Sequence, residues 1–431
     1  MAVAVDRGPA TRRFAPVEGS ALLHPVAAWA LMTAGVAVTV LVARDGSLGS
    51  RAFRVVAAAG TTLLSIAALQ RWNGRRGGRC ATAFGILTFT VGAGFLPHLI
   101  KNGLSVTSIA AAIASFAGLG TAIAGSVVTA AGRKPVGRVA SMLVTLFATA
   151  VVACVVSPAV MATNVPRPQI GANPASKGLR YESVVLATSD GVHLAAWYLP
   201  GTNRAGIVLL HGAGSTRSSV LDQAAVLAEH GFGVLLVDAR GHGESGGRAM
   251  DFGWYGDRDI EAAIRFLTGR ADVDSARIGV MGMSMGGEEA LGASASNALI
   301  RAVVAEGATA RSAADEAWLS DEFGWRGVVQ EQIERVQDVV TDALTSASPP
   351  ISNRRAVEMS TTTRYLIIAA GEEPDEIHAG EYVAAVAPDR VELWTVAGSG
   401  HTEGLATAPE NWERRVINFL SSALLGDGPD W

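Results

Sequence analysis

The stretch GVMGMSMGGEEA, residues 279–290, decides how the C-terminal half of the chain is interpreted. It contains the pattern Gly-x-Ser-x-Gly, with Ser284 between Gly282 and Gly286. Because so short a pattern also arises by chance, it indicates a nucleophile only in fitting surroundings. These are a strand that ends at the serine, a helix that begins there, and partner residues farther along the chain.

The residues around Ser284 meet the first two requirements. RIGVMGM is an apolar run typical of a buried strand, and GGEEALGASAS is typical of a helix. The flanking glycines allow a sharp turn without a Cβ clash. The N-terminus of the helix would stabilise negative charge that develops beside the serine. The sequence therefore predicts Ser284 as a nucleophile at a strand–helix turn.

From residue 180 onward, short β-branched runs alternate with helical patterns. We predict strands at 182–188, 193–199, 206–210, 233–238, 278–283, 302–306, 365–370 and 391–396. We predict helices at about 217–230, 257–269, 285–296, 376–386 and 409–424. Continuous apolar strands with helical crossovers predict a mostly parallel sheet covered by helices on both faces. Ligands bind such sheets beyond the carboxyl ends of the strands.

The partners of the serine should follow in the order acid, then histidine. His401, in VAGSGHTEG after the last predicted strand, is the predicted general base, which takes the Ser284 proton and returns it to the leaving group. The acid should follow the strand RYLIIAAG, and we predict Asp375, because a short carboxylate at the end of a loop can orient an imidazole. The alternative acids are Glu372, Glu373 and Glu306.

The segment LLHGAGSTR, residues 209–217, supplies the predicted oxyanion side. It follows a buried strand, and the N–H groups of Ala213 and Met285 would bind the oxygen of a tetrahedral intermediate. His211 is expected to hold the shape of this loop and not to react.

Residues 180–425 resemble the α/β-hydrolase superfamily, most closely its branch of dienelactone-hydrolase, prolyl-oligopeptidase and serine-aminopeptidase-like members. Five motifs carry the resemblance, in order along the chain: VLLHGAG, VDARGHGESGG, YGDRDIEAAIRFL, RIGVMGMSMGGEEAL and VAGSGHTEGL. The resemblance implies a Ser-His-acid hydrolase that acts through an acyl-enzyme, with no metal or organic cofactor. By position it makes Ser284 the nucleophile, His401 the base, and Ala213 and Met285 the oxyanion donors.

The chain departs from this family at the acid. The acid loop of the family often has Gly-x-x-Asp, but here Pro374 occupies the Asp position and Asp375 lies one place later. An insertion at about 308–360 corresponds to the cap over the active site, and its aromatic residues either line an acyl pocket or hold the cap to the core. Four residues match a structural turn of the family and are not expected to be catalytic: Asp238, Arg240, His242 and Ser245.

The first 163 residues are far more apolar than the rest of the 431-residue chain. Five apolar stretches lie at about 24–43, 52–70, 81–100, 105–130 and 139–161. About 20 apolar residues suffice to cross a bilayer, and the second stretch is the weakest candidate. We therefore predict an all-α transmembrane domain of about five helices at 1–163, a linker at 164–179 and a hydrolase domain at 180–431. A signal peptide is the alternative interpretation of the first stretch.

The basic loops predict the orientation of these spans. Loops 71–79 and 133–138 carry most of the positive charge and are expected in the cytoplasm, together with Arg7, Arg12 and Arg13 of the N-terminal tail. Five spans then place the hydrolase domain outside, although Arg44, Arg51 and Arg54 oppose this and loss of the second span would reverse it. No Asp or Glu lies inside a predicted span, which favours an anchor over a transporter or sensor.

Composition excludes other classes of partner and site. The net charge is −4 with no polybasic cluster, so a nucleic-acid partner is not expected. Both cysteines, Cys80 and Cys154, lie at or within apolar segments, so the hydrolase domain has no disulfide or cysteine–metal site. The predicted function is a membrane-anchored serine hydrolase that cleaves a small-molecule or lipid-like carboxylic ester. A serine peptidase and a non-catalytic binding or scaffold protein are the alternatives.

Overall fold

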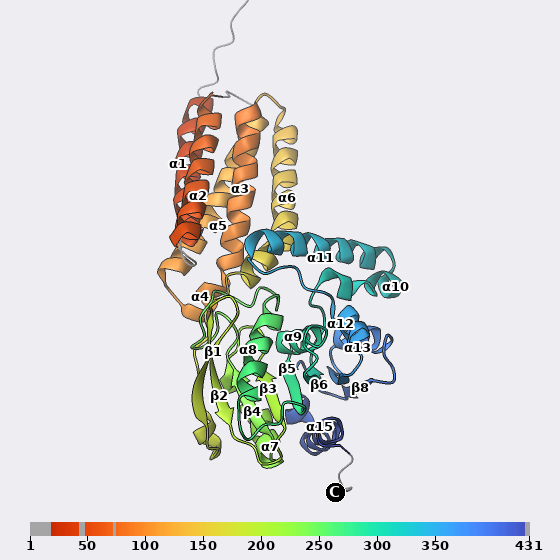
Figure 1. Ribbon diagram of the computed structural model, residues 1–431. Coiled ribbons are helices and arrows are strands. Elements are labelled where there is room, and N and C mark those ends of the chain that lie inside the picture. Colours follow the sequence, from red (N-terminus) through yellow and green to blue (C-terminus); the bar gives the residue numbers. More distant parts are fainter. Residues whose placement is uncertain (1–18, 43–47, 72–74, 427–431) are drawn as a thin grey trace, which may run out of the picture. The chain divides into compact units, whose positions relative to one another are not determined.

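The computed structural model describes residues 19–42, 48–71 and 75–426 (Figure 1). It divides into two units: Met1–Ala93 with Ile109–Ala153, and Gly94–Ser108 with Cys154–Trp431. The basic tail with Arg7, Arg12 and Arg13 lies outside the described residues, as do Arg44 and residues 72–74 of the loop at 71–79.

The region before residue 163 is helical, as predicted. Its helices are α1 (Gly19–Val42), α2 (Leu48–Arg71), α3 (Arg75–Phe95), α4 (Pro97–Asn102), α5 (Val106–Thr129) and α6 (Pro135–Ala162). Three stretches are long and apolar enough to cross a membrane: Arg75–Asn102, Val106–Thr129 and Pro135–Ala162. They coincide with the third, fourth and fifth predicted spans, so this region is compatible with membrane insertion.

The first two predicted spans do not match the candidate spans of the described residues. Within the described residues, the first contributes only the shorter apolar helix Ala30–Leu41. The second, α2, is a helix of 24 residues but is not among the candidate spans in the described part of the chain. Arg51 and Arg54 near its start lower its hydropathy.

Helices α3 and α5 approach each other through small residues seven positions apart. A Cβ atom added to Gly85 would lie 2.6 Å from the carbonyl oxygen of Gly118. Seven residues earlier, a Cβ atom on Gly78 would lie 2.7 Å from the carbonyl oxygen of Gly125. Close approach of backbones at small residues is the usual way in which membrane helices associate, because dispersion contacts replace the missing hydrophobic force.

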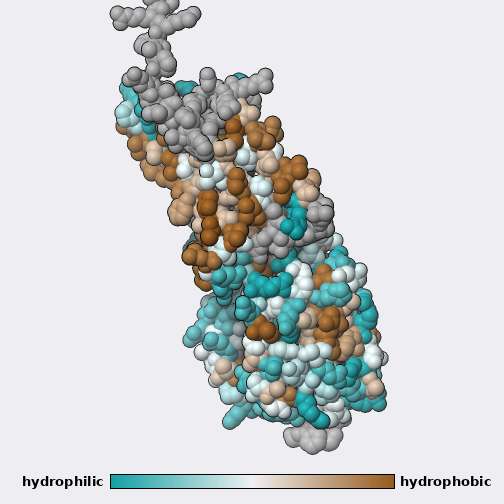
Figure 2. All heavy atoms as spheres, turned by 90° about the vertical axis from the view of Figure 1, so that its left-hand side faces the viewer, coloured by the Kyte–Doolittle hydropathy of each residue, from teal (hydrophilic) through white to brown (hydrophobic). Residues whose placement is uncertain are grey.

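Helix α6 leaves large apolar side chains uncovered by protein. Val139, Leu143, Val144 and Phe147 are 57–72% exposed. On the face drawn in Figure 2, hydrophobic side chains gather over the N-terminal helices and hydrophilic ones over much of the C-terminal unit. Exposed apolar surface of this extent would be unfavourable in water, so it is compatible with membrane insertion.

The C-terminal unit is built on a sheet of eight strands, which confirms the predicted fold class. The strands are β1 (Glu182–Ala187), β2 (His193–Leu199), β3 (Gly206–Leu210), β4 (Gly233–Val237), β5 (Ile278–Met283), β6 (Ile300–Glu306), β7 (Arg364–Ala370) and β8 (Val391–Val396). Their order is β1-β2-β4-β3-β5-β6-β7-β8, with β2 antiparallel to both neighbours and strands β3 to β8 parallel. Each observed strand lies within two residues of the predicted one.

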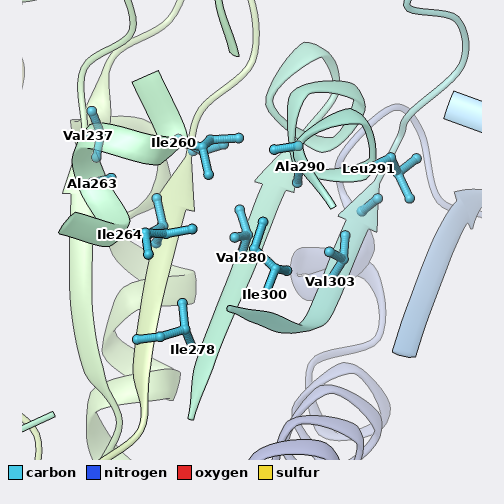
Figure 3. Packing of buried hydrophobic residues seen from close by; sticks show 14 of the residues in the cluster. Val237, Ile260, Ala263, Ile264, Ile278, Val280, Ala290, Leu291, Ile300 and Val303 are labelled. Carbon is cyan, nitrogen blue, oxygen red and sulfur yellow. The ribbon is translucent and has the colours of Figure 1, made fainter. Parts of the chain in front are cut away.

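Helices cover both faces of this sheet. They are α7 (Leu221–Glu229), α8 (Gly256–Thr268), α9 (Met285–Ala293), α13 (Pro374–Ala384), α14 (Gly404–Thr407) and α15 (Pro409–Leu424). On one face, Ile264 of α8 and Ala290 of α9 belong with Val280 of β5 to one cluster of buried hydrophobic residues (Figure 3). On the other face, α7 and α15 bury Leu227 and Trp412 against the sheet.

The insertion between β6 and β7, which the sequence predicts as a cap, is helical. It contains a short 3₁₀ helix, η3 (Ala313–Glu316), followed by α10 (Leu319–Phe323), α11 (Trp325–Leu344) and α12 (Asn353–Met359). Trp318 is buried and stacks on His378 of α13, with ring centroids 5.0 Å apart. Trp325, in contrast, is 77% exposed. Of the two roles considered for the cap aromatics, Trp318 therefore holds the cap to the core.

The segment predicted as a linker, residues 164–179, packs on the C-terminal unit. Ile170 and Leu179 are partly buried against its core, and the Gly171 amide donates to Ser218 Oγ at 3.0 Å. The prediction rested on its proline, glycine and asparagine content, which describes a lack of regular structure and not a lack of contacts.

Candidate active site

The carboxyl ends of the parallel strands meet at one edge of the sheet, and the predicted site residues follow them. Ser284 comes directly after β5 and forms the N-cap of α9, with φ 52° and ψ −124°. A non-glycine residue rarely adopts a positive φ, and such strain persists only where neighbours enforce it. Here the Ser284 amide donates to the Glu306 carbonyl at 2.7 Å, and the Ser284 carbonyl accepts from the Gly287 amide at 2.8 Å.

Both glycines of the Gly-x-Ser-x-Gly pattern are required by close backbone contacts. A Cβ atom on Gly282 would lie 2.5 Å from the Gly287 nitrogen. A Cβ atom on Gly286 would lie 2.7 Å from the His211 carbonyl oxygen. Any larger residue would push the turn away from its neighbours. The pattern in the sequence therefore has a steric cause, which places the serine side chain at the tip of the turn.

The predicted oxyanion loop runs beside Ser284. A Cβ atom on Gly212 would lie 3.1 Å from Ser284 Cβ and 3.7 Å from its Oγ. Ala213 is exposed and Met285 half-buried, and neither amide donates to another described residue. Two N–H groups without a partner among the described residues, one next to the serine in sequence and one in the adjacent loop, match the requirement for stabilising a developing oxyanion.

Two buried histidines fix this loop. His211 Nε2 accepts from the Ala239 amide at 3.0 Å, so its Nδ1 carries the proton and donates to the Gly212 carbonyl at 2.7 Å. His242 Nε2 accepts from the Gly214 amide at 3.0 Å, and its Nδ1 donates to the Arg240 carbonyl at 2.8 Å. Burial lowers the pKa of both histidines to about 4. They are neutral parts of the scaffold, with both ring nitrogens occupied.

The polar side chains of the turn that follows β4 are also engaged in structural hydrogen bonds and ion pairs. The Asp238 carboxylate accepts from the Arg217 amide at 2.8 Å and from the Glu244 amide at 2.9 Å, and it pairs with the Arg217 guanidinium at 2.5 Å. The Ser245 hydroxyl donates to the Asp238 carbonyl at 2.6 Å. Arg240 pairs with Asp190 and Asp259. These partners leave the four residues of this turn without a free group for catalysis.

His401 lies in the loop after β8, next to the segment that contacts the serine turn. Its Nδ1 is 2.5 Å from Oε1 of Glu376. A Cβ atom on Gly307 would lie 3.0 Å from His401 Cε1. Gly307 directly follows Glu306, whose carbonyl accepts the Ser284 amide. The serine and the histidine thus approach the same short segment after β6.

The residue paired with His401 differs from the one predicted. Glu376 lies in the first turn of α13, is almost fully buried, and accepts the Ala370 amide through Oε2 at 2.8 Å. Asp375, Glu372 and Glu373 are all exposed. Glu306 is buried, but the Gly404 amide and the Trp412 indole N–H occupy it. Glu376 therefore replaces Asp375 as the candidate acid.

The reason for this correction is the start of α13. The sequence pattern predicts a helix that begins at about residue 376, which places residues 372–375 in a loop from which any carboxylate can reach the histidine. In the structure α13 begins at Pro374, a residue favoured at the first helical position. Consecutive helical residues point in directions about 100° apart, so one side chain faces His401 while its neighbour faces solvent. Proline was the signal that could have placed the helix start two residues earlier.

The charge on Glu376 alters the titration of the histidine. Its hydrogen bond raises the pKa of His401 above the ordinary value of 6.5, against the opposing effect of burial. Because Nδ1 is held by the carboxylate, Nε2 remains available for proton transfer. The His401 side chain is 48% exposed and that of Glu376 is 4% exposed. A half-exposed imidazole backed by a buried carboxylate is suited to accept and return a proton.

Residues 201–358 match the protein-family model described as serine aminopeptidase, S33. The matched segment contains the oxyanion loop, the Ser284 turn and the cap, and it forms the central part of the eight-stranded sheet. The C-terminal part of the chain has the α/β-hydrolase fold.

This hydrolase domain is similar to curated proteins over a shorter stretch. It is 38% identical over 112 residues to the uncharacterized protein Rv2307c of Mycobacterium tuberculosis, covering 25% of this chain and 39% of that protein. It is 33% identical over 118 residues to the alpha/beta hydrolase domain-containing protein WAV2 of Arabidopsis thaliana, covering 26% of this chain and 38% of that protein. The chain thus spans less than half the length of these relatives. Among solved structures, the Pyrococcus furiosus esterase Pf2001 is similar with a TM-score of 0.49 and 24% identity, covering 61% of this chain and 98% of that chain.

The hydrolase domain also buries carboxylates near the catalytic candidates. Glu288, one turn into α9, accepts from both the amide and the hydroxyl of Thr309 at 3.1 Å. Burial raises its pKa to about 7. Burial likewise raises the pKa of Glu316, in the cap, to about 7. Within the described residues, no three His, Cys, Asp or Glu side chains are grouped so as to hold a metal ion.

Proposed function

We propose that this α/β hydrolase is a serine hydrolase that cleaves carboxylic esters through an acyl-enzyme. Ser284 is the nucleophile, His401 the general base and Glu376 the acid that orients it. The amides of Ala213 and Met285 are the oxyanion donors. The observation that carries the proposal is the 2.5 Å contact between His401 and the buried Glu376, beside a strained serine whose backbone is held on both sides.

The steps follow from these positions. Ser284 Oγ forms a bond to the acyl carbon while His401 Nε2 takes its proton. The imidazolium is stabilised by Glu376, and the two amides donate hydrogen bonds to the negatively charged carbonyl oxygen. Collapse breaks the bond to the alkoxide, which receives the proton from His401. A water molecule then repeats the sequence at the acyl-enzyme, which releases the acid and restores the serine.

Cleavage of an aminoacyl amide is a second candidate. The description of the matching family model names an aminopeptidase. The buried carboxyl groups of Glu288 and Glu316 also supply negative charge when ionised, which would favour a cationic substrate group. Their pKa values of about 7 mean that this charge is only partly developed at neutral pH. The ester proposal needs no such charge, because an ester substrate does not require a cationic group.

Substrate profiling of the purified full-length protein separates these candidates. The panel contains p-nitrophenyl esters of increasing chain length and aminoacyl p-nitroanilides, with Ser284→Ala as the matched blank. We expect turnover of the esters that is lost in the variant. Faster cleavage of the anilides would favour the aminopeptidase instead. Absence of Ser284-dependent turnover on both series would contradict the proposal.

We also propose that the N-terminal helices anchor the enzyme, with the hydrolase domain on the extracytoplasmic side. The three candidate spans suffice for this orientation. Arg75, Arg76 and Arg79 lie at the N-terminal end of the first of them, and loop 133–138 follows the second, so both basic regions lie on one side. The third span then crosses to the other side, whatever α1 and α2 do.

Alkaline extraction and protease protection test the anchor. Carbonate at high pH should leave the chain in the membrane pellet, whereas a peripheral protein would be released. Protease added to right-side-out vesicles should remove the hydrolase domain. Digestion only in inverted vesicles would place the domain in the cytoplasm.

A further inference from the structure

The segment that joins α6 to the first strand of the sheet, β1, binds the turn after β4. Arg167, five residues after the end of α6, donates from its guanidinium to three carbonyl oxygens. These belong to Gly243 at 3.2 Å, Ser245, and Gly247 at 3.1 Å. In the opposite direction, the Gly243 amide donates to the Pro168 carbonyl at 3.1 Å. Four hydrogen bonds thus join two adjacent residues of the segment to one turn.

This turn has little conformational preference of its own. Gly241, Gly243 and Gly247 all have positive φ, at 71°, 47° and 81°. Glycine loses more backbone freedom on ordering than any other residue, so the turn depends on its contacts. On its inner side it wraps Asp238, and a Cβ atom on Gly243 would clash with the Asp238 carboxylate. Its outward-facing carbonyls are held by Arg167.

The turn at 241–247 also holds the oxyanion loop. His242, within the turn, accepts the amide of Gly214, which is the neighbour of Ala213. Arg217, at the end of the oxyanion loop, bonds to Asp238 and also pairs with Glu244 of the turn. Two contacts therefore connect the turn to the loop that carries the first oxyanion donor, and a displaced turn would displace that loop.

We propose that Arg167 is a positioning residue for the oxyanion loop, which it holds in place through the turn at 241–247. This inference rests on the proposed function, because it assigns Arg167 to the oxyanion side of that mechanism. Arg167 contacts no reacting atom, so its effect is confined to the placement of donors. The chain between the end of α6 and the active site is then part of the catalytic scaffold.

The test compares variants of the full-length protein in detergent. Arg167→Gln removes the charge and the forked donors, whereas Arg167→Lys keeps the charge but has one donor nitrogen in place of the two that reach the three carbonyls. Arg180→Gln is the matched control, since Arg180 is an exposed arginine close in sequence with no hydrogen bond or ion pair among the described residues. The readouts are kcat and KM for a p-nitrophenyl ester, the affinity for a trifluoromethyl ketone, which becomes an oxyanion on binding, and Tm.

We expect Arg167→Gln to lower kcat about tenfold with KM changed less than twofold, because a small misplacement of donors weakens transition-state binding. The affinity for the ketone should fall by the same factor, Arg167→Lys should lie between, and Arg180→Gln should match wild type. Unchanged kcat in Arg167→Gln, or a loss of kcat without a loss of ketone affinity, would overturn the inference alone. Wild-type protein without turnover would instead overturn the proposed function, and this inference with it.

Discussion

The histidines on the two sides of Ser284 occupy opposite environments. On the oxyanion side, His211 and His242 are buried, each ring bonds to the backbone at both nitrogens, and burial lowers their pKa to about 4. On the other side, His401 is half-exposed, has one carboxylate partner, and has a raised pKa. One environment holds a neutral ring in a fixed role, and the other leaves a nitrogen free to exchange a proton.

This difference separates scaffold from chemistry more clearly than residue type does. All three histidines lie in glycine-rich loops after strands, at the same edge of the sheet. A carboxylate partner stabilises the imidazolium that a general base must form, whereas burial without such a partner opposes it. Replacement of residues on each side of Ser284 should therefore cost turnover on one side and folding stability on the other.

The largest effect is expected from replacing one histidine of each kind. His401→Gln should lower kcat/KM by about 10⁴-fold or more with little change in Tm, because it removes the proton acceptor. His242→Ala should instead destabilise the fold by roughly 2–4 kcal/mol, since it opens a cavity and leaves the Gly214 amide unpaired. Steady-state kinetics and chemical denaturation of both variants measure this contrast. Equal losses of stability would contradict the division into two roles.

Replacement of the acid should have the next largest effect. Glu376→Gln is expected to lower kcat by about 10²- to 10⁴-fold, because the imidazolium loses its counter-charge while the side-chain shape is kept. Asp375→Asn, one residue earlier and exposed, is the matched control and should stay within about twofold of wild type. The same kinetic assay measures both. A large loss in Asp375→Asn with an active Glu376→Gln would restore the original prediction.

The pH profile should report the same carboxylate. Catalysis needs neutral His401, so kcat/KM rises with pH through the pKa of that residue in the free enzyme. Glu376 raises this pKa, so the acidic limb of wild type should lie above 6.5. In Glu376→Gln the limb should move to lower pH, although the plateau is lower. A limb that stays in place would show that another group controls the titration.

The smallest effect is expected at Glu306, the buried acid whose backbone carbonyl accepts the Ser284 amide. Glu306→Gln should lower the free energy of unfolding by about 1–3 kcal/mol, because an amide presents one acceptor where the carboxylate accepts both Gly404 and Trp412. Activity should remain within a few-fold of wild type. Denaturant titration measures the change in the free energy of unfolding, and ester turnover measures the activity. Loss of turnover without loss of stability would make Glu306 part of the catalytic machinery.

Much of the hydrolase fold could be predicted from the sequence, because each strand is a short apolar run bounded by glycine or polar residues. Ser284 and His401 could be proposed from motif and order. Glu376 could not, since the choice among four adjacent acidic residues depends on where α13 begins and which side chain it buries. The contacts of Arg167 were equally hidden, because they join residues about 80 positions apart through backbone carbonyls that carry no sequence pattern.

The central claim is that Ser284 is an activated nucleophile, and covalent labelling tests it most directly. The folded full-length protein is treated with a fluorophosphonate probe, digested and analysed by mass spectrometry. We predict a single adduct on Ser284, no adduct in Ser284→Ala, and much slower labelling of His401→Gln. A folded wild-type protein that stays unlabelled, or a Ser284→Ala variant labelled as fast as wild type, would contradict the account.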